Sequence, residues 1–102
     1  MPVTTSLSDG VLTAYLSGDI DHHSAAEMRE VIDHQAESCL PDRLVLDFGG
    51  VTFMDSSGIG LIMGRYKLMR SMHGTLAAAN VSPRLKTIIH LAGADLLAAI
   101  EP

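Results

Sequence analysis

The sequence predicts a single α/β domain with a mixed β-sheet, in the element order β-β-α-β-α-β-α-β. Two observations support this class. Asp9-Gly10 separates two strand-like segments, which is typical of an antiparallel hairpin. Further along, helical apolar patterns alternate with short apolar segments, as in parallel strands joined by crossover helices. We expect the helices to pack mainly on one face of the sheet, and the alternative is a sheet covered on both faces.

Length and composition indicate a globular domain with an aliphatic core. The chain has 102 residues, so residues 1–102 form one domain, and 47% of them are hydrophobic. There are two Tyr, two Phe and no Trp, which leaves the core to Leu, Ile, Val, Ala and Met. The net charge of −5 and the absence of a basic run argue against nonspecific nucleic-acid binding.

Location is indicated by what the sequence lacks. The single cysteine, Cys39, excludes an internal disulfide and fits a reducing compartment. The N-terminal residues show no cationic region followed by an apolar one, so no signal peptide is predicted. No apolar run approaches the roughly 20 residues that span a bilayer. We therefore predict a cytoplasmic protein without membrane contact.

The first half of the chain predicts a hairpin followed by a helix. Residues 3–8 form an edge strand, and residues 11–17 alternate as a strand paired antiparallel with it. Ser24 and Glu27 have capping-box spacing, while Asp21 offers an earlier cap. The helix ends before Pro41. Its apolar stripe comprises Ala25, Met28, Ile32, Gln35 and Cys39.

The middle of the chain predicts a buried strand and a long helix. Residues 43–48 form the strand, which Gly49-Gly50 breaks before residues 51–54 continue the chain. A helix extends from Ser56 to about His73, and Gly74 stops it. Its stripe is Ile59, Ile62, Met63, Tyr66 and Met69, widened by Leu61, Leu68 and Met72. The cations in its second half complement the helix dipole: Arg65, Lys67 and Arg70.

The last part predicts a strand, a helix and a final strand. Residues 75–80 are weak by strand propensity, but their position between two helices indicates a buried parallel strand. Ser82-Pro83 begins a helix that Gly93 ends. The buried stripe of this helix is Leu85, Ile88, Ile89 and Ala92. Residues 96–100 form the last short strand.

The segment Asp55-Ser56-Ser57-Gly58 opens the longest helix and has two readings. In the first, Ser or Asp caps the helix, and Gly58 and Gly60 allow close packing. In the second, a serine at this helix N-terminus is a phosphorylation switch, because free N–H groups and the helix dipole accept a phosphate there. Such a modification changes the charge of the surface without unfolding the domain.

Enzymatic and metal-binding readings fit the sequence poorly. A nucleophile elbow requires Gly-x-Ser-x-Gly, but Met54 and Asp55 occupy the first position for Ser56 and Ser57. The motif also lacks the lysine of a P-loop. His22-His23 has no further ligands at metal-binding spacing, so an exposed pair is expected there. The sequence therefore predicts no catalytic residue, no metal and no cofactor.

Three segments resemble the STAS domain family, and within it the anti-sigma factor antagonists. Residues 51–60 with residues 64–67 resemble the family signature. Residues 18–25 resemble its first loop and helix start, and residues 80–83 with residues 91–93 resemble its third helix region. These matches occur in the family's order over nearly the whole chain.

The resemblance implies a phosphorylation-switched binding protein without catalytic activity. The unphosphorylated form binds an anti-sigma factor that is itself a serine kinase, and so frees the sigma factor. The kinase phosphorylates Ser56, the complex dissociates, and a serine phosphatase reverses the modification. By analogy the partner surface comprises Asp21, Asp55, Ser56, Ser57 and Gly58.

Two further expectations come from the resemblance. In the alternative function, the chain is a STAS subunit of a transporter ATPase or of a stress-signalling assembly, and it binds its partner constitutively. The family usually continues into a C-terminal helix, whereas this sequence stops at Pro102, so that helix is expected to be short or absent. Self-association could cover the surface left exposed by a missing helix.

Overall fold

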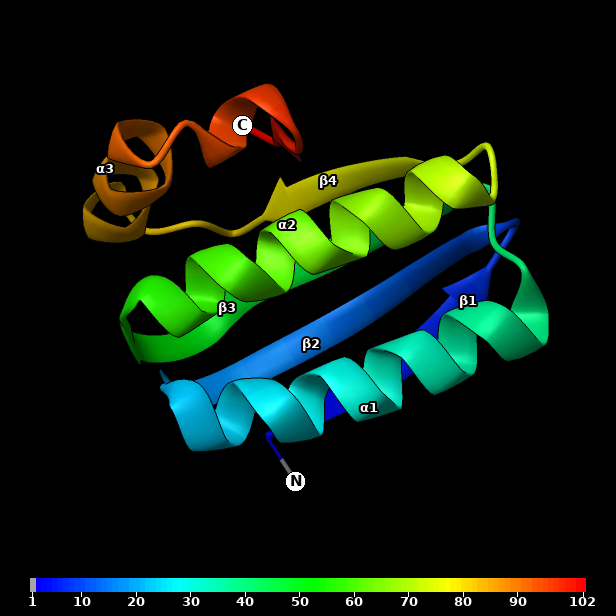
Figure 1. Ribbon diagram of the computed structural model, residues 1–102, viewed down its shortest axis with the longest axis horizontal. Helices are drawn as coiled ribbons and strands as arrows, with labels where there is room; N and C mark the ends of the chain where they lie inside the picture. The colour runs from blue at the N-terminus through cyan, green and yellow to red at the C-terminus, as the bar shows by residue number, and fades with distance from the viewer. Residues whose placement is uncertain (1) are drawn as a thin grey trace.

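The computed structural model describes residues 2–102, which form a five-stranded mixed sheet with three α-helices (Figure 1). In chain order the elements are β1 (Val3–Ser8), β2 (Val11–Ile20), α1 (His22–Cys39), β3 (Arg43–Met54), α2 (Ser56–Ser71), β4 (Thr75–Ala79), α3 (Pro83–Leu91), the short 3-10 helix η1 (Ala94–Leu96) and β5 (Ala99–Ile100). This order confirms the predicted fold class.

The sheet follows the chain order, β1-β2-β3-β4-β5. Strands β1 and β2 pair antiparallel, and every later pair is parallel. Asp9 and Gly10 both have positive φ, +51° and +79°, which is the backbone of a type I′ turn. The hairpin is therefore as predicted, and the crossover helices account for the parallel pairs.

The helices cover one face of the sheet. Figure 1 shows α1 and α2 side by side in front of the strands, with α3 beyond β4. The core between these layers is almost entirely aliphatic, with Phe48 its only fully buried aromatic side chain among residues 2–102. Other fully buried side chains are Leu12, Leu16, Ile20, Met28, Ile32, Leu44, Leu46, Ile62, Met69 and Ile89. The predicted single layer of helices is confirmed.

The prediction that Gly49-Gly50 breaks the third strand is wrong, because β3 continues to Met54. A Cβ on Gly50 would lie 3.0 Å from the carbonyl oxygen of Leu16 and 3.1 Å from Cβ of Ser17. The glycine therefore permits close approach of β2, beside a register shift in their pairing. As a result β2 also extends beyond the predicted residue 17, and Ile20 pairs with Met54.

Helix α1 differs from the prediction in its cap and in one residue of its stripe. Asp21 is the N-cap, so the earlier of the two predicted caps is correct and Ser24 belongs to the first turn. Gln35 is exposed, and the neighbouring Ala36 is fully buried instead. Adjacent positions are about 100° apart on a helix, and the buried row of α1 follows the four-residue spacing of Met28, Ile32 and Ala36, which leaves Gln35 outside it.

Helix α2 ends earlier than predicted, at Ser71. His73 takes the left-handed conformation, with φ of +59°, and the Gly74 N–H donates to the carbonyl of Met69 at 2.8 Å. Gly74 thus closes the turn just beyond the helix. Met63 is 44% exposed, although it was placed on the buried stripe. Arg65, which was predicted only as a cation that complements the helix dipole, is buried.

The C-terminal part follows the prediction except at its end. The Ser82 hydroxyl caps α3 by accepting the N–H of Leu85, and Gly93 ends it with φ of +76°. Ala92 is exposed rather than buried. The last strand is shorter than residues 96–100, because Leu96 belongs to η1 and is 87% exposed. Within residues 2–102, no helix is long and apolar enough to cross a membrane.

Candidate functional site

The predicted site residues lie at one edge of the sheet, where two parallel strands end together. Ile20 and Met54 are paired at the ends of β2 and β3, and an aspartate follows each of them. The Asp55 N–H also donates to the carbonyl of Ile20 at 3.2 Å. Helices α1 and α2 begin immediately afterwards, so their N-termini lie side by side (Figure 1). The strand pairing therefore brings Asp21 and Asp55 to the same edge.

Asp21 is held as a carboxylate at the start of α1. Its Oδ1 accepts the N–H groups of His23 and Ser24 at 3.0 and 2.9 Å. The Ser24 hydroxyl accepts the Asp21 N–H at 3.0 Å, which completes a capping box. The backbone hydrogen bond from Ser24 is the largest of the causes that lower the pKa of Asp21. The charge at this exposed position is therefore fixed in place.

Asp55, and not a serine, caps α2. Its side chain accepts the Ser57 N–H at 2.7 Å, and its carbonyl accepts the Gly58 N–H at 3.0 Å. Ser56 is the first helical residue and is exposed, while Ser57 is half-buried. Within residues 2–102 the Ser56 hydroxyl makes no hydrogen bond, so its oxygen is accessible and is not needed to begin the helix.

The two glycines of the motif differ in their surroundings. Gly58 is buried, and a Cβ there would overlap the Met54 side chain and lie 3.5 Å from Cγ2 of Ile20. The first turn of α2 therefore rests directly on the ends of β2 and β3, as predicted for close packing. Gly60 has nothing within 4 Å of its Cβ position, so close packing is a wrong explanation for that glycine.

Three residues of this edge were not singled out from the sequence. The Thr52 hydroxyl donates to Oδ1 of Asp19 at 2.7 Å, across the β2–β3 pair. Phe53 pairs with Asp19 in register and is 47% exposed beside it. These residues were not predicted because the strand was expected to end at Gly49-Gly50. Only the continuation of β3 to Met54 brings Thr52 and Phe53 next to Asp19.

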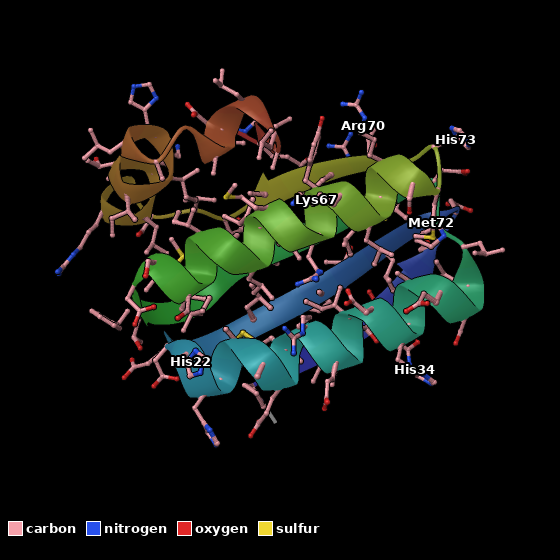
Figure 2. The ribbon with its side chains drawn as sticks, viewed as in Figure 1. His22, His34, Lys67, Arg70, Met72 and His73 are labelled. Atoms are coloured by element: carbon pink, nitrogen blue, oxygen red, sulfur yellow. The ribbon has the colours of Figure 1, made fainter. Side chains whose placement is uncertain are left out.

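The histidines do not form a metal site. His22 and His23 are both exposed at the start of α1 (Figure 2). Nε2 of His23 lies 3.8 Å from Oε1 of Glu27, one turn along the helix. In the described part of the chain, residues 2–102, no group of three or more His, Cys, Asp or Glu could hold a metal ion. The edge thus offers an accessible hydroxyl, ionised carboxylates and two helix N-termini, a combination suited to binding and to modification.

Comparison with known proteins assigns the family. The STAS domain model matches residues 3–102. An anti-sigma F factor antagonist of Paenibacillus polymyxa is 37% identical over 84 residues, which are 82% of this chain and 72% of the relative. Its name does not denote an enzyme, in agreement with the predicted absence of catalytic activity.

Solved structures share the fold. An anti-sigma factor antagonist from Mycobacterium paratuberculosis has a TM-score of 0.86 at 26% identity, over 98% of this chain and 84% of that one. Unphosphorylated SpoIIAA, also an anti-sigma factor antagonist, has a TM-score of 0.83 at 23% identity, over 98% of this chain and 88% of its own. With nearly the whole chain matched by the family model, this protein belongs to the STAS domain family.

Proposed function

We propose that the chain is an anti-sigma factor antagonist controlled by phosphorylation of Ser56. In this proposal the unphosphorylated form binds an anti-sigma factor serine kinase in the cytoplasm and frees the sigma factor. The kinase transfers the γ-phosphoryl group of ATP to the Ser56 hydroxyl, which leaves ADP and a phosphoserine that no longer binds. A serine phosphatase restores the binding form. The names of the relatives support the general role.

The observation that carries the switch is the position of the Ser56 hydroxyl. It is exposed at the first position of α2, and the Asp55 side chain already supplies the cap. A phosphate can therefore be added without removing a hydrogen bond that the helix needs. It brings nearly two negative charges to an edge that already carries Asp21 and Asp55. A partner that fits the unmodified edge then meets like charge and added volume.

The structure also favours Ser56 over Ser57 as the acceptor. Ser57 is half-buried and its N–H is the group that Asp55 caps, so a phosphate on Ser57 would crowd the start of the helix. Gly58 is buried beneath the same turn, so it stabilises the turn and does not itself contact the partner. In this proposal Asp21, Asp55, Ser56 and Ser57 face the partner.

Phosphate mapping tests the proposal. The purified chain is incubated with ATP and each anti-sigma factor kinase of its organism, and the modified residue is located by mass spectrometry. We expect one phosphate, on Ser56, that is absent from Ser56→Ala and present on the matched control Ser57→Ala. Phosphate on another residue, or none with any of the kinases, would refute the switch. A partner recovered from a transporter complex would favour constitutive binding instead.

A further inference from the structure

A groove of about 490 Å³ lies between α1 and α2, lined by side chains within residues 22–29 of α1 and 57–65 of α2. His22 and Ser57 are among its lining residues. The groove opens at the edge described above, since Ser57 follows Ser56 and His22 follows Asp21. A protein that covers Ser56 therefore also reaches the groove.

Small residues keep this groove open. Ala25 and Ala26 line it from α1, and Gly60 and Gly64, one turn apart, line it from α2. A Cβ on either glycine would meet no atom within 4 Å, so these glycines are not required by packing inside the domain. Since glycine inside a helix is less stable than alanine, their occurrence here is not explained by the fold.

Two arginines line the groove, and among residues 2–102 one of them is paired with a carboxylate and the other is not. Arg65 is only 6% exposed, and its Nε lies 2.8 Å from Oδ1 of Asp33. Arg29 lines the same groove, is exposed, and takes part in none of the ion pairs of residues 2–102. Burial and, to a smaller extent, the charge of Arg29 lower the pKa of Arg65, while Asp33 raises it. Asp33 thus pairs with Arg65, and Arg29 is left as an exposed cation of the groove in a chain with a net charge of −5.

We propose that this groove receives a carboxylate side chain of the protein partner, which pairs with Arg29 while the partner covers Ser56. The inference rests on the proposed function and adds a second contact to it. The acidic edge and the basic groove are adjacent surfaces of opposite sign. A partner must therefore present a basic patch and an acidic side chain at matching positions, and this pattern gives specificity and orientation.

The test measures the dissociation constant for the anti-sigma factor that binds the wild-type chain. Arg29→Glu is expected to raise this constant about tenfold or more, because it places like charges together. Arg84→Glu, an exposed charge reversal on α3, is the matched control and should change it less than about twofold. Thermal unfolding of each variant checks that the exposed substitutions leave the domain folded.

A second pair of variants tests the space of the groove. Gly64→Leu fills it from α2 and should weaken binding, while the domain stays folded because its Cβ position is open. Lys67→Leu introduces the same side chain on the exposed surface of α2 outside the groove lining, and should bind as the wild type does. If Gly64→Leu weakens binding of the anti-sigma factor and Lys67→Leu does not, the result supports occupation of the groove by the partner.

A charge exchange identifies the occupant. The exposed Asp and Glu residues of the partner are changed singly to Lys, and one change is expected to restore binding to Arg29→Glu. Ser56→Asp, which adds negative charge at the proposed switch, is expected to weaken binding. If it does so while Arg29→Glu and Gly64→Leu keep wild-type affinity, the groove is overturned and the proposed function stays intact. If Arg29→Glu loses affinity and no single Asp→Lys or Glu→Lys change in the partner restores it, the proposal that a partner carboxylate occupies the groove is overturned. A wild-type chain that binds no anti-sigma factor would remove both proposals.

Sedimentation of the chain without a partner shows whether a second copy of the chain, and not an anti-sigma factor, occupies the groove. Under our proposal wild type and Arg29→Glu sediment alike. A wild-type dimer that Arg29→Glu dissociates would show that a second copy occupies the groove, and would contradict a carboxylate from the partner.

Discussion

At the scale of single residues, two aspartates organise the edge by capping adjacent helices. Asp21 and Asp55 each follow the last residue of a strand and each accept backbone N–H groups of the helix that begins there. Ser56, the residue after Asp55, is therefore not needed to cap α2. This division explains how an exposed hydroxyl can be modified while the helix start is preserved.

The charge of Asp21 should appear in the pH dependence of stability. Its folded-state pKa is lowered, chiefly by the Ser24 backbone, relative to an unfolded value of about 3.9. The contribution is therefore complete above the unfolded pKa and is lost as the pH falls through the folded pKa. Urea unfolding from about pH 5 downward should show a shallower loss for Asp21→Asn than for wild type. Parallel curves would contradict this role.

The two glycines of the motif provide a matched pair of alanine substitutions. Gly58→Ala should destabilise the domain by about 1–3 kcal/mol, because the new methyl overlaps the Met54 side chain and the first turn must move. Gly60→Ala should be neutral or stabilise it by about 0.5–1 kcal/mol, since its Cβ position is open. Equilibrium unfolding of both variants measures the difference, and equal effects would contradict the packing described.

At the scale of elements, a largely buried ion pair joins the two helices that begin at the edge. Arg65 of α2 contacts Asp33 of α1 through Nε at 2.8 Å and Nη2 at 3.3 Å, and its Nη1 donates to the Leu61 carbonyl. Burial raises the pKa of Asp33, while the charge of Arg65 lowers it. The pair fixes the relative position of α1 and α2 behind the proposed partner surface.

Replacing only one residue of this ion pair should destabilise the domain more than replacing both residues. Arg65→Met leaves the Asp33 carboxylate, 27% exposed, without its partner, and should lower the free energy of unfolding by about 1–3 kcal/mol. Adding Asp33→Leu should recover much of that loss, because neither charge then remains. Denaturant unfolding of the two variants gives the comparison. A double variant no more stable than the single one would contradict the predicted recovery, and its difference from wild type gives the net contribution of the pair.

The element order was predictable from the sequence, but the junctions that shape the site were not. Period-2 and period-3.6 patterns located the strands and helices, and Ser82-Pro83 fixed the start of α3. Gly49-Gly50 appeared as a break because glycine is depleted in strands, whereas its reason is a long-range approach of β2. The burial of Arg65 was not predicted, because its partner, Asp33, lies on another helix. Contacts distant in sequence decided both cases.

The candidate site was predictable in part. Asp55 and Ser56 stood out as a helix start, and the structure gives Asp55 the cap. Their proximity to the start of α1 depends on the pairing of Ile20 with Met54, which local patterns do not specify. The groove could not be predicted from local patterns either, because its lining residues come from two helices. The assignment of Ser56 as the modified residue remains a prediction.

At the scale of the whole molecule, the proposed switch is an exposed residue at one edge of the domain, beside the end of the core at Ile20 and Met54. A negative charge on Ser56 should therefore leave the fold unchanged. In two-dimensional amide NMR spectra, Ser56→Asp should shift signals near the starts of α1 and α2 and leave the β1–β2 turn at the opposite edge unaffected. Shifts throughout the hairpin would indicate a global rearrangement and contradict a local switch.

The most direct test of the account compares the affinity of one cognate anti-sigma factor kinase for the chain before and after complete phosphorylation of Ser56. Titration calorimetry with a kinase variant that binds but cannot transfer phosphate measures both forms at the same salt concentration. We predict tight binding of the unmodified chain and a dissociation constant at least about tenfold higher after phosphorylation. Equal affinity of the two forms would contradict the account.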